Sequence, residues 1–552
     1  MTVPFAPNPT EQGSWLDPDK ARLAPPDSNP HDPPLRRRSE KSSRPVVVIG
    51  AGVGGIAAAA HLARLGFRVR VFEKNGRPGG RLDHFWRDGH HFDTGPTLLV
   101  LPLVYQAEFE RLGSSFAQAL DLQRVDPTYR LIFGDGRQLA LTSDDRAMHD
   151  QLEAIEPGSY AAYLRYLKEG ADSYRTAMKL LVDREPRLLP DLLSPHALAL
   201  LRQVPSFLPH YRRMRTYFDD PRLKAAFTFQ DIYMGLSPFE APALFSMMPY
   251  SELAHGVWFP RGGMYCIVEA LMDIALAAGV EFEFDSPVQR ILADDDSVEA
   301  ILLEDGRRVA AAAVVANADL PYVYQHLLPD DGRAQRLARK RYSCSVISFF
   351  WGVDRPVEVL GPHTLFLADD YRGDFDSIDR RHGLADNPSL YVHAPAHIDP
   401  SLAPPGQDTL TAIVPVGHLD ESAGQDWPAL RHRARRAVLS RLATLGVTDL
   451  EAHLKFEVNY TPLSWRKRYN LVKGATHGLS HTLTQMAYFR PANRHPRLRN
   501  VYFVGASTHP GTGVPTALIS GRLTAERLAR EVQSPSSHSL SRLFRSGEGT
   551  KG

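Results

Sequence analysis

The chain has 552 residues, of which 64 are Lys or Arg and 63 are Asp or Glu. This length exceeds what one hydrophobic core usually serves, so we expect two or three lobes, and a hydrophobic fraction of 43% is that of an ordinary globular protein. The balanced charge and the lack of a recognition motif argue against nucleic acid as a partner. Two isolated cysteines, and histidines without zinc-ligand spacing, argue against a disulfide framework and a bound metal.

The two ends of the chain are predicted to be disordered. Residues 1–43 are rich in proline and polar side chains and residues 533–552 are rich in serine, so neither offers enough apolar bulk to offset the entropy of ordering. The first tail has no apolar stretch long enough for a signal peptide. The apolar run at 45–63 is rich in glycine and alanine, and a strand, turn and helix explain it better than a membrane span.

A nucleotide-binding pattern follows the first tail. Val46–Ile49 and Arg68–Phe72 are predicted strands, and Gly54–Leu65 is the predicted helix that joins them. The turn before the helix has the pattern GxGxxG, whose glycines permit a tight turn, close approach of a pyrophosphate and close packing of helix on strand. The helix N-terminus adds free N–H groups for the phosphates. The dinucleotide site is therefore assigned to Gly50, Gly52, Gly54 and Gly55.

A carboxylate and the far end of the chain complete this prediction. Glu73 stands about 20 residues beyond the glycines, where a carboxylate accepts hydrogen bonds from a ribose, and we assign it together with Lys74. Near the C-terminus, Val501–Gly505 is a predicted strand and Pro515–Leu528 a predicted helix, whose free N–H groups stabilise negative charge. This second half of the site is assigned to Gly505, Gly513, Val514 and Pro515.

The middle of the chain gives a coarser pattern. From about 117 to 253 it is mainly helical and interrupted by prolines, and its segment 188–208 carries many leucines among few charges. That segment is either packed core or an apolar surface that sits in the outer part of a bilayer. Strand-like alternation returns at 281–284, 300–303, 309–316, 345–350 and 409–416.

Several segments resemble the phytoene desaturases of the bacterial and fungal type, which are FAD-dependent carotenoid desaturases. They are GAGVGGIAAAAHLARLGFRVRVFEKNGRPGGR, FDTGPT, AFTFQDIYMGLSPFEAPALFSMMPY, GVWFPRGGM and a C-terminal block that contains THPGTGVP. The resemblance covers most of 46–528. It implies an α/β fold in which a Rossmann-like, amine-oxidase-like FAD-binding domain carries a substrate domain and a helical membrane-facing insert.

The resemblance also implies how the chain is divided. The FAD-binding domain is expected in three parts, at 44–116, 255–330 and 490–532, with the insert at 117–254 and the substrate domain at 331–489. By resemblance, Gly80 and Arg81 lie by the phosphate and ribityl region of FAD, Gly95, Pro96 and Thr97 pass the flavin ring, and the backbone of Val288 contacts adenine.

The implied reaction is a desaturation. Hydride passes from an allylic carbon of phytoene or a related carotenoid to FAD, which introduces a trans double bond, and oxygen or a membrane quinone is the electron acceptor. A lipid-soluble substrate enters from a bilayer, so we expect peripheral attachment to membrane lipid on the cytoplasmic side, without a spanning helix. The expected tunnel lining is Phe227, Phe229, Tyr233, Met234, Phe245, Met247 and Met248.

Three side chains are candidates for a catalytic base. Asp231 and Glu240 lie in apolar segments of the resemblance, and His509 lies near the predicted flavin end. Each has a structural alternative: a salt bridge or helix cap for the two acids and turn stabilisation for the histidine. A base is not essential, because an allylic cation makes the neighbouring proton acidic.

Other functions fit parts of the pattern. A carotenoid ketolase or isomerase, an amine oxidase, or a desaturase of a later or C30 intermediate would use the same cofactor site. A non-catalytic binder of prenyl chains on the same fold is an alternative of another class. The intact glycine pattern and Glu73 argue against that alternative, which requires no flavin.

Overall fold

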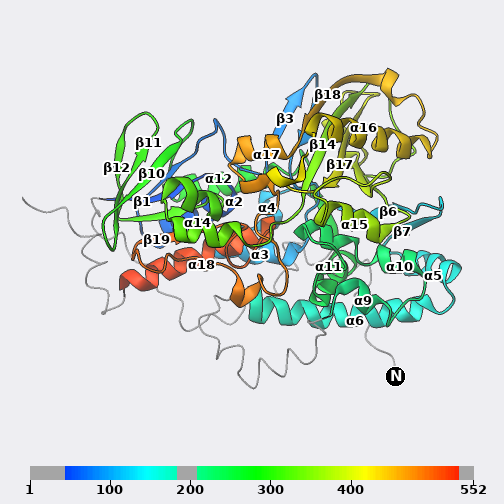
Figure 1. The fold of residues 1–552 in the computed structure, drawn as a ribbon, viewed down its shortest axis with the longest axis horizontal. Coiled ribbons are helices and arrows are strands. Elements are labelled where there is room, and N and C mark those ends of the chain that lie inside the picture. The colour runs from blue at the N-terminus through cyan, green and yellow to red at the C-terminus, as the bar shows by residue number, and fades with distance from the viewer. Residues whose placement is uncertain (1–43, 183–207, 534–552) are drawn as a thin grey trace, which may run out of the picture.

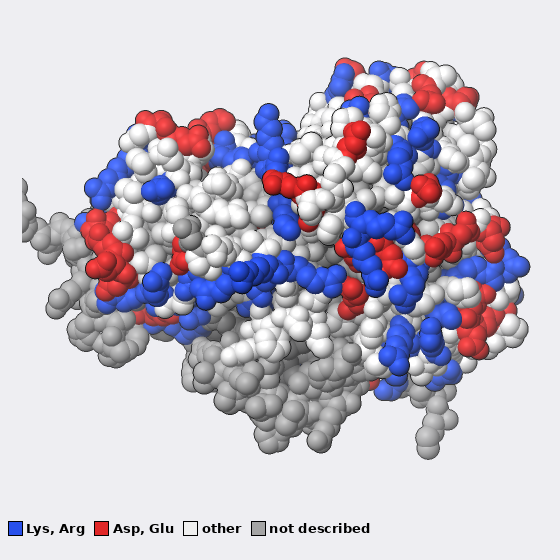
Figure 2. Space-filling view, in the orientation of Figure 1, with Lys and Arg blue, Asp and Glu red and all other residues white. Residues whose placement is uncertain are grey.

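The computed structural model describes residues 44–182 and 208–533. The predicted N-terminal tail, the C-terminal tail beyond residue 533 and all but the last residue of the leucine-rich segment 188–208 lie outside the described residues. Figure 1 shows one region around a parallel sheet, another around a larger sheet, and helices below that larger sheet. Both signs of charge are spread over the face in Figure 2, in keeping with the near-neutral sequence.

The nucleotide-binding pattern forms the middle of a five-stranded parallel sheet. Its strands in spatial order are β19 (Val501–Phe503), β13 (Ala313–Ala316), β1 (Val46–Ile49), β2 (Val69–Phe72) and β9 (Glu281–Glu283). β1 and β13 are buried along their whole length, as expected for strands of a parallel sheet that is covered on both faces. The βαβ start is confirmed, and the last strand of the chain joins the same sheet.

Helix α2 (Val53–Arg64) packs against two helices from distant parts of the chain, α12 (Cys266–Ala277) and α18 (Val514–Gln533). Small side chains make the contact with α18 close: a Cβ on Gly521 would lie 2.7 Å from the backbone nitrogen of Ala58. The two predicted helices are therefore confirmed, and their contact brings the first and last segments of the nucleotide-binding region together.

The larger sheet has seven strands. In spatial order they are β18 (Leu454–Tyr460), β14 (Ser345–Val353), β17 (Asp408–Val416), β16 (Leu390–His393), β15 (His363–Phe366), β6 (Tyr129–Ile132) and β7 (Gln138–Leu141). Successive side chains of a strand point to opposite faces. Ile347 and Val414 pack into the core beneath α16 (Trp427–Ala443), whereas Ser348 and Ile413 line a cavity on the other face.

The segment 117–254 is helical for most of its described length but also contains strands. β6 and β7 complete the larger sheet, and β5 (Leu122–Val125) pairs with β8 (Val257–Pro260). β6 and β7 form a local hairpin, whereas β15, which pairs with β6, and β8, which pairs with β5, lie far along the chain. None of the described helices has the length and apolar character needed to cross a membrane.

The remaining elements connect these layers. The short strands are β3 (His84–Arg87), β4 (His90–Asp93), β10 (Val288–Ala293), β11 (Val298–Leu303) and β12 (Arg308–Ala310). The helices are α3 (Pro102–Arg111), α4 (Phe116–Ala119), α5 (Asp145–Ile155), α6 (Ser159–Ala177), η2 (Met178–Val182), α9 (His210–Met214), α10 (Pro221–Ala226), η3 (Phe229–Met234), η4 (Ala243–Ser246), α11 (Met247–His255), α13 (Leu320–Tyr322), η5 (Val323–Leu327), α14 (Asp331–Ala338), α15 (Tyr371–Asp379), η6 (Pro395–His397), η7 (Pro400–Leu402), η8 (Glu421–Ala423), η9 (Leu450–His453), α17 (Pro462–Tyr469), η10 (Val472–Gly474) and η11 (Ala487–Phe489).

Candidate active site

A cavity of about 800 Å³ lies between the carboxyl ends of the parallel strands and the larger sheet. This is the edge of an open α/β sheet at which ligands bind. The predicted cofactor residues in its wall are Gly50, Gly52, Gly54, Glu73, Lys74, Gly80, Arg81, Gly95, Pro96, Thr97, Val288, Gly505, Gly513, Val514 and Pro515. The structure thus brings together segments from the beginning, middle and end of the chain, and Gly55 lies just behind them.

The glycine turn after β1 is packed too closely to accept side chains. Gly50 has a φ of +97°, which favours glycine. A Cβ on Gly52 would lie 2.9 Å from Nδ2 of Asn317, and a Cβ on Gly55 only 2.1 Å from the Gly50 carbonyl oxygen. The first turn of α2 contains no acidic residue, so its free N–H groups offer a positive site to an anion. These features fit a dinucleotide pyrophosphate.

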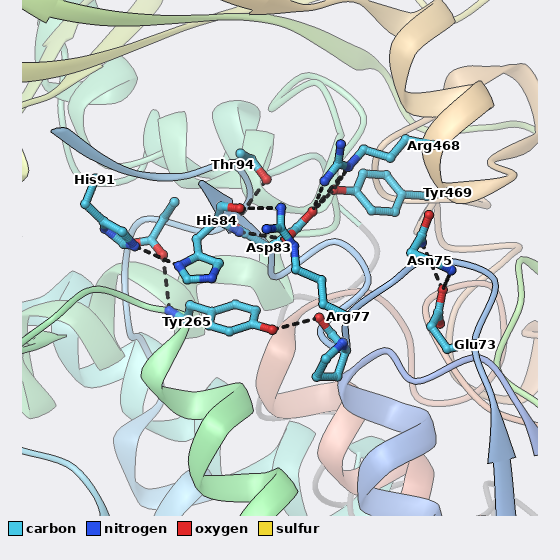
Figure 3. Close-up of polar contacts among 12 residues, drawn as sticks. Glu73, Asn75, Arg77, Asp83, His84, His91, Thr94, Tyr265, Arg468 and Tyr469 are labelled. Atoms are coloured by element: carbon cyan, nitrogen blue, oxygen red, sulfur yellow. Dashed lines mark hydrogen bonds and ion pairs between the residues drawn. The ribbon is translucent and has the colours of Figure 1, made fainter. Parts of the chain in front are cut away.

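Glu73, at the end of β2, supports the same turn. Its Oε2 accepts a hydrogen bond from the Ala51 backbone N–H at 2.8 Å. Its Oε1 accepts from the backbone and side-chain amides of Asn75, each at 2.9 Å, and Figure 3 shows Glu73 beside Asn75. Burial raises the pKa of Glu73, against the lowering effect of these hydrogen bonds. The carboxylate therefore holds the glycine turn in place, at the position expected for contact with a ribose.

Arg81 is a partly buried cation in the cavity wall. Its guanidinium donates to the Thr476 carbonyl oxygen at 2.5 Å, and the negative charge of Asp319 opposes the lowering of its pKa by burial. Asp319 itself accepts hydrogen bonds from the Ser507 hydroxyl at 2.5 Å and the Val472 N–H at 3.1 Å. Sequence reasoning missed Asp319, although it closely follows β13. Gly505 is followed by Ala506 and Ser507 and not by an acid, and Asp319 supplies a carboxylate beside Ser507 instead.

The loop at Gly95–Thr97 is fixed to the larger sheet. The Thr97 hydroxyl and the Tyr391 hydroxyl lie 2.9 Å apart, and the same tyrosine oxygen lies 2.7 Å from Nδ1 of His363. Burial holds the pKa of His363 well below its ordinary value, so the ring is neutral. Thr97 and Tyr391 both line the cavity, and their contact joins the predicted flavin loop to the opposite wall.

A buried carboxylate, Asp83, ties the N-terminal region to the segment at 468–469. Its Oδ2 accepts from Arg468 Nη2 at 2.6 Å and from the Tyr469 hydroxyl at 3.0 Å, and its Oδ1 contacts Arg77 Nε at 2.7 Å (Figure 3). Burial raises the pKa of Asp83, but the hydrogen bonds and charges of the two arginines outweigh burial and lower it below 3.8. The pattern search missed this residue because its partners are far away in sequence.

Replacement of Asp83 by Asn is expected to destabilise the fold by about 2 kcal/mol at pH 7, since it leaves two guanidinium groups uncompensated. The figure is below that for a fully buried pair because both arginines are more than a third exposed. Because the pKa of Asp83 is lower in the folded state, its ionised carboxylate stabilises the fold at any pH above the unfolded-state pKa. This stabilisation is lost as the pH falls through the folded-state pKa. Denaturant unfolding of the wild-type protein and of Asp83→Asn at pH 7 and pH 3 measures the difference in the free energy of unfolding. An undiminished difference at pH 3 would contradict the ionic origin.

The three candidate bases lie outside the cavity lining. Asp231 is buried, with its carboxylate 3.0 Å from Nδ1 of His210. Glu240 forms an ion pair with Arg341 at 2.6 Å near the surface. His509 is buried in the turn before α18, and its carbonyl oxygen accepts from the Asn493 side-chain amide at 2.9 Å. These are the positions expected of the structural alternatives, namely a salt bridge for each acid and turn stabilisation for the histidine.

Most of the expected tunnel lining is in the wall. The lining residues among those predicted are Phe229, Tyr233, Met234, Phe245, Met247 and Met248. Phe227 instead belongs to the core beside the cavity, where it is fully buried. Sequence reasoning also missed Glu252, a buried acid on α11 that contacts Tyr129. A lone acid in the apolar stretch 247–253 was the signal for it.

Comparison with known proteins agrees with this geometry. The model of the flavin-containing amine oxidoreductase family matches residues 53–529. A zeta-carotene-forming phytoene desaturase from Myxococcus xanthus is 44% identical over 88% of this chain and 94% of its own length. A phytoene desaturase from Fusarium fujikuroi is 39% identical over 88% of this chain and 89% of its own.

The fold comparison extends the likeness to a solved structure. A redesigned variant of putrescine oxidase superposes with a TM-score of 0.61 over 88% of this chain and 99% of its own, at 17% identity, which shows a shared fold. The chain belongs to the flavin-containing amine oxidoreductase family, as an FAD-dependent oxidoreductase of the phytoene desaturase type.

Proposed function

We propose that the protein desaturates phytoene or a closely related polyene hydrocarbon, with trans double bonds as the product. The observation that carries this proposal is the composition of the cavity wall. One side carries the glycine turn and the other residues suited to FAD, and the other side is formed by apolar side chains of the larger sheet and of η3, η4 and α11. A long hydrocarbon in such a cavity lies against the cofactor site without contact to bulk water.

The chain provides a place for each part of FAD. The glycine turn and the N-terminus of α2 would hold the pyrophosphate, Glu73 would accept from the ribose, and Val288 would meet the adenine. α18 begins at Val514, and its first turn has no acidic residue, so its free N–H groups would stabilise negative charge on the isoalloxazine. When bound, FAD supplies the hydride acceptor.

The apolar wall binds and orients the substrate. Leu365, Ile413 and Phe245 present side chains that bury hydrocarbon surface, which stabilises the complex by about 25 cal/mol for each Å² removed from water. Holding an allylic carbon at a fixed position supplies the proximity that the reaction requires. The same wall excludes water from the reacting carbons.

Glu73 offers a test of the cofactor half of the site. In the variant Glu73→Gln, one oxygen is replaced by an amide donor that faces N–H donors of Ala51 or Asn75. An unsatisfied buried pair of this kind costs about 1–3 kcal/mol, so we expect FAD affinity to fall by roughly 5- to 150-fold. Flavin fluorescence titration of the apoprotein measures this, and an unchanged affinity would show that Glu73 does not support the site.

The proposal extends to the division of the chain into units, its contact with the membrane and its electron acceptor. The three FAD-binding parts at 44–116, 255–330 and 490–532, the insert at 117–254 and the substrate domain at 331–489 are the proposed units. A water-insoluble polyene has to enter from lipid, which supports a peripheral, membrane-facing role for the insert, on the cytoplasmic side. Oxygen or a membrane quinone would reoxidise the cofactor.

The test is incubation of the FAD-loaded protein with phytoene in liposomes under air, followed by chromatography of the extracted polyenes. New trans double bonds, counted from the absorbance bands, would support the proposal. If phytoene is unchanged while a C30 analogue or a later carotenoid is desaturated, the substrate assignment is wrong. If none of these polyenes changes and the flavin remains bound, the reaction itself is misassigned.

A further inference from the structure

A chain of hydroxyl groups leads from the cavity wall to a buried carboxyl group. Tyr233 of η3 lines the cavity, and its hydroxyl donates to the hydroxyl of Tyr129 on β6. The Tyr129 hydroxyl donates to Oε1 of Glu252 on α11 at 3.0 Å, and the Gln230 side-chain amide donates to Oε2 at 3.1 Å. Glu252 is only 2% exposed, so the carboxyl has no direct access to solvent.

The direction of these hydrogen bonds follows from valence. When Glu252 is ionised its oxygens only accept, so Tyr129 must then give its single hydroxyl proton to Glu252. The Tyr129 oxygen then accepts the proton of Tyr233, and the Tyr233 oxygen has lone pairs but no further proton to donate. The chain is therefore oriented to move a proton away from the cavity and toward Glu252.

Packing alone does not explain the carboxyl group. Among the described residues, the hydrogen bonds to Glu252 come from the neutral groups of Tyr129 and Gln230, and no ion pair is formed. Burial of an acid without a cation is costly, and such an acid at a cavity is a candidate for function. Asp231, on the same η3 helix as Tyr233, differs because it is paired with His210 and lies outside the cavity lining.

We propose that Glu252 is the proton acceptor of the desaturation and that Tyr233 and Tyr129 conduct the proton to it. The inference rests on the proposed function. With FAD bound as the hydride acceptor, one allylic carbon of the polyene would give up a hydride, and the adjacent carbon would lose a proton to the Tyr233 oxygen. The electron pair of the C–H bond that loses the proton becomes the new double bond, while the other pair leaves with the hydride. Tyr233 passes its own proton to Tyr129, and Tyr129 passes its proton to the carboxylate, which becomes neutral.

Of Glu252 and the tyrosines that face it, Glu252 is the group that changes its protonation between pH 6 and pH 9. Burial raises the pKa of Glu252 to about 8, against the opposing effect of the Gln230 and Tyr129 hydrogen bonds. The facing groups are Tyr129 of β6, Tyr233 of η3, Tyr166 of α6 and Tyr391 of β16, and burial raises the pKa of each further above 10. They stay neutral between pH 6 and pH 9.

The expected pH dependence has a definite sign. A base acts in its ionised form, so the rate of single-turnover flavin reduction by phytoene in liposomes should rise about tenfold from pH 7 to pH 9, as the carboxylate fraction rises through a pKa of about 8. In Glu252→Gln this rise should disappear, and the rate at pH 9 should fall by 10²- to 10⁴-fold. Among the described residues, the buried Oε1 atom of Gln230 has no hydrogen-bond partner, so rotation of the Gln230 amide would let it accept from the amide that Glu252→Gln introduces.

Two further variants separate the relay from a structural effect. Tyr129→Phe keeps the carboxyl but breaks the chain, so it should lower the rate and leave the fold and flavin content unchanged. Asp231→Asn removes a neighbouring buried acid outside the cavity and should keep the rise with pH. Infrared difference spectra of the substrate-free protein should show a carboxyl C=O band that disappears near pH 8 and is absent in Glu252→Gln.

The outcomes distinguish this inference from the proposed function. If wild-type protein reduces its flavin with phytoene but Glu252→Gln and Tyr129→Phe keep the wild-type rate and pH profile, the relay is wrong and the desaturation stands. The same holds if the infrared band does not change between pH 6 and pH 9. If Asp231→Asn alone loses the rise with pH, the base is Asp231. If wild-type protein does not react with any polyene, the proposed function fails first.

Discussion

A methyl group at Gly55 is expected to remove FAD from the protein. In Gly55→Ala the new Cβ would lie 2.1 Å from the Gly50 carbonyl oxygen, and both groups belong to the backbone of the turn. The turn must open to relieve this overlap, which displaces the N–H groups at the start of α2. A forced backbone shift of this kind costs about 3 kcal/mol, equivalent to roughly 100-fold weaker binding. The measurement is the flavin content per protein after desalting.

The control for this prediction is Gly332→Ala. Gly332 lies in α14, far along the chain from the glycine turn, and a Cβ there would meet only a side-chain oxygen of Asp330 at 3.5 Å. Alanine favours a helix over glycine by about 1 kcal/mol, so this variant should retain its flavin and its stability. Full flavin content in Gly55→Ala would contradict the assigned role of the turn.

A large side chain in the apolar wall is expected to stop polyene desaturation without loss of the cofactor. Ile413 of β17 lines the cavity, while its neighbours Ala412 and Val414 face the core on the other side of the sheet. In Ile413→Trp the indole would occupy space that the hydrocarbon needs. Displacement of a substrate by about 1 Å can cost 10²-fold in rate, so kcat/KM for phytoene should fall at least about 100-fold.

The matched control is the same side chain on the surface. Leu276 of α12 is 53% exposed, so Leu276→Trp adds an indole outside the cavity and should leave desaturation unchanged. Flavin content and thermal unfolding of both variants verify that the fold is intact. If Ile413→Trp desaturates phytoene at the wild-type rate, the polyene does not bind along this face of the larger sheet.

The cofactor half of the site was predictable because its signals are local. The glycines, the two flanking strands and Glu73 lie within a single βαβ unit, so spacing alone indicated their roles. The C-terminal helix was also predictable from a strand, a glycine-rich turn and a proline. Its contact with α2 required the structure, because small side chains such as Ala58 do not specify a partner.

For the substrate half of the site, the sequence predicted an apolar lining but not the arrangement of the elements that form it. Apolar residues near 229–248 suggested a lining, but local sequence did not indicate that β6 pairs with β15 to extend the larger sheet. The candidate bases were sought in family-like segments and near the predicted flavin end, which gave Asp231, Glu240 and His509. The structure shows instead that Asp231 is paired with His210 and that Glu252 is linked to the cavity through Tyr129 and Tyr233. Such chains depend on tertiary contacts between distant segments.

If the polyene and FAD share one cavity, hydride passes directly from hydrocarbon to flavin. The most direct test is an anaerobic single turnover of FAD-loaded protein with phytoene in liposomes, with flavin absorbance and polyene absorbance recorded together. We expect one equivalent of flavin absorbance to be lost for each new double bond, with the same rate constant for both signals. Formation of double bonds while the flavin stays oxidised, or loss of flavin absorbance without a new polyene band, would contradict it.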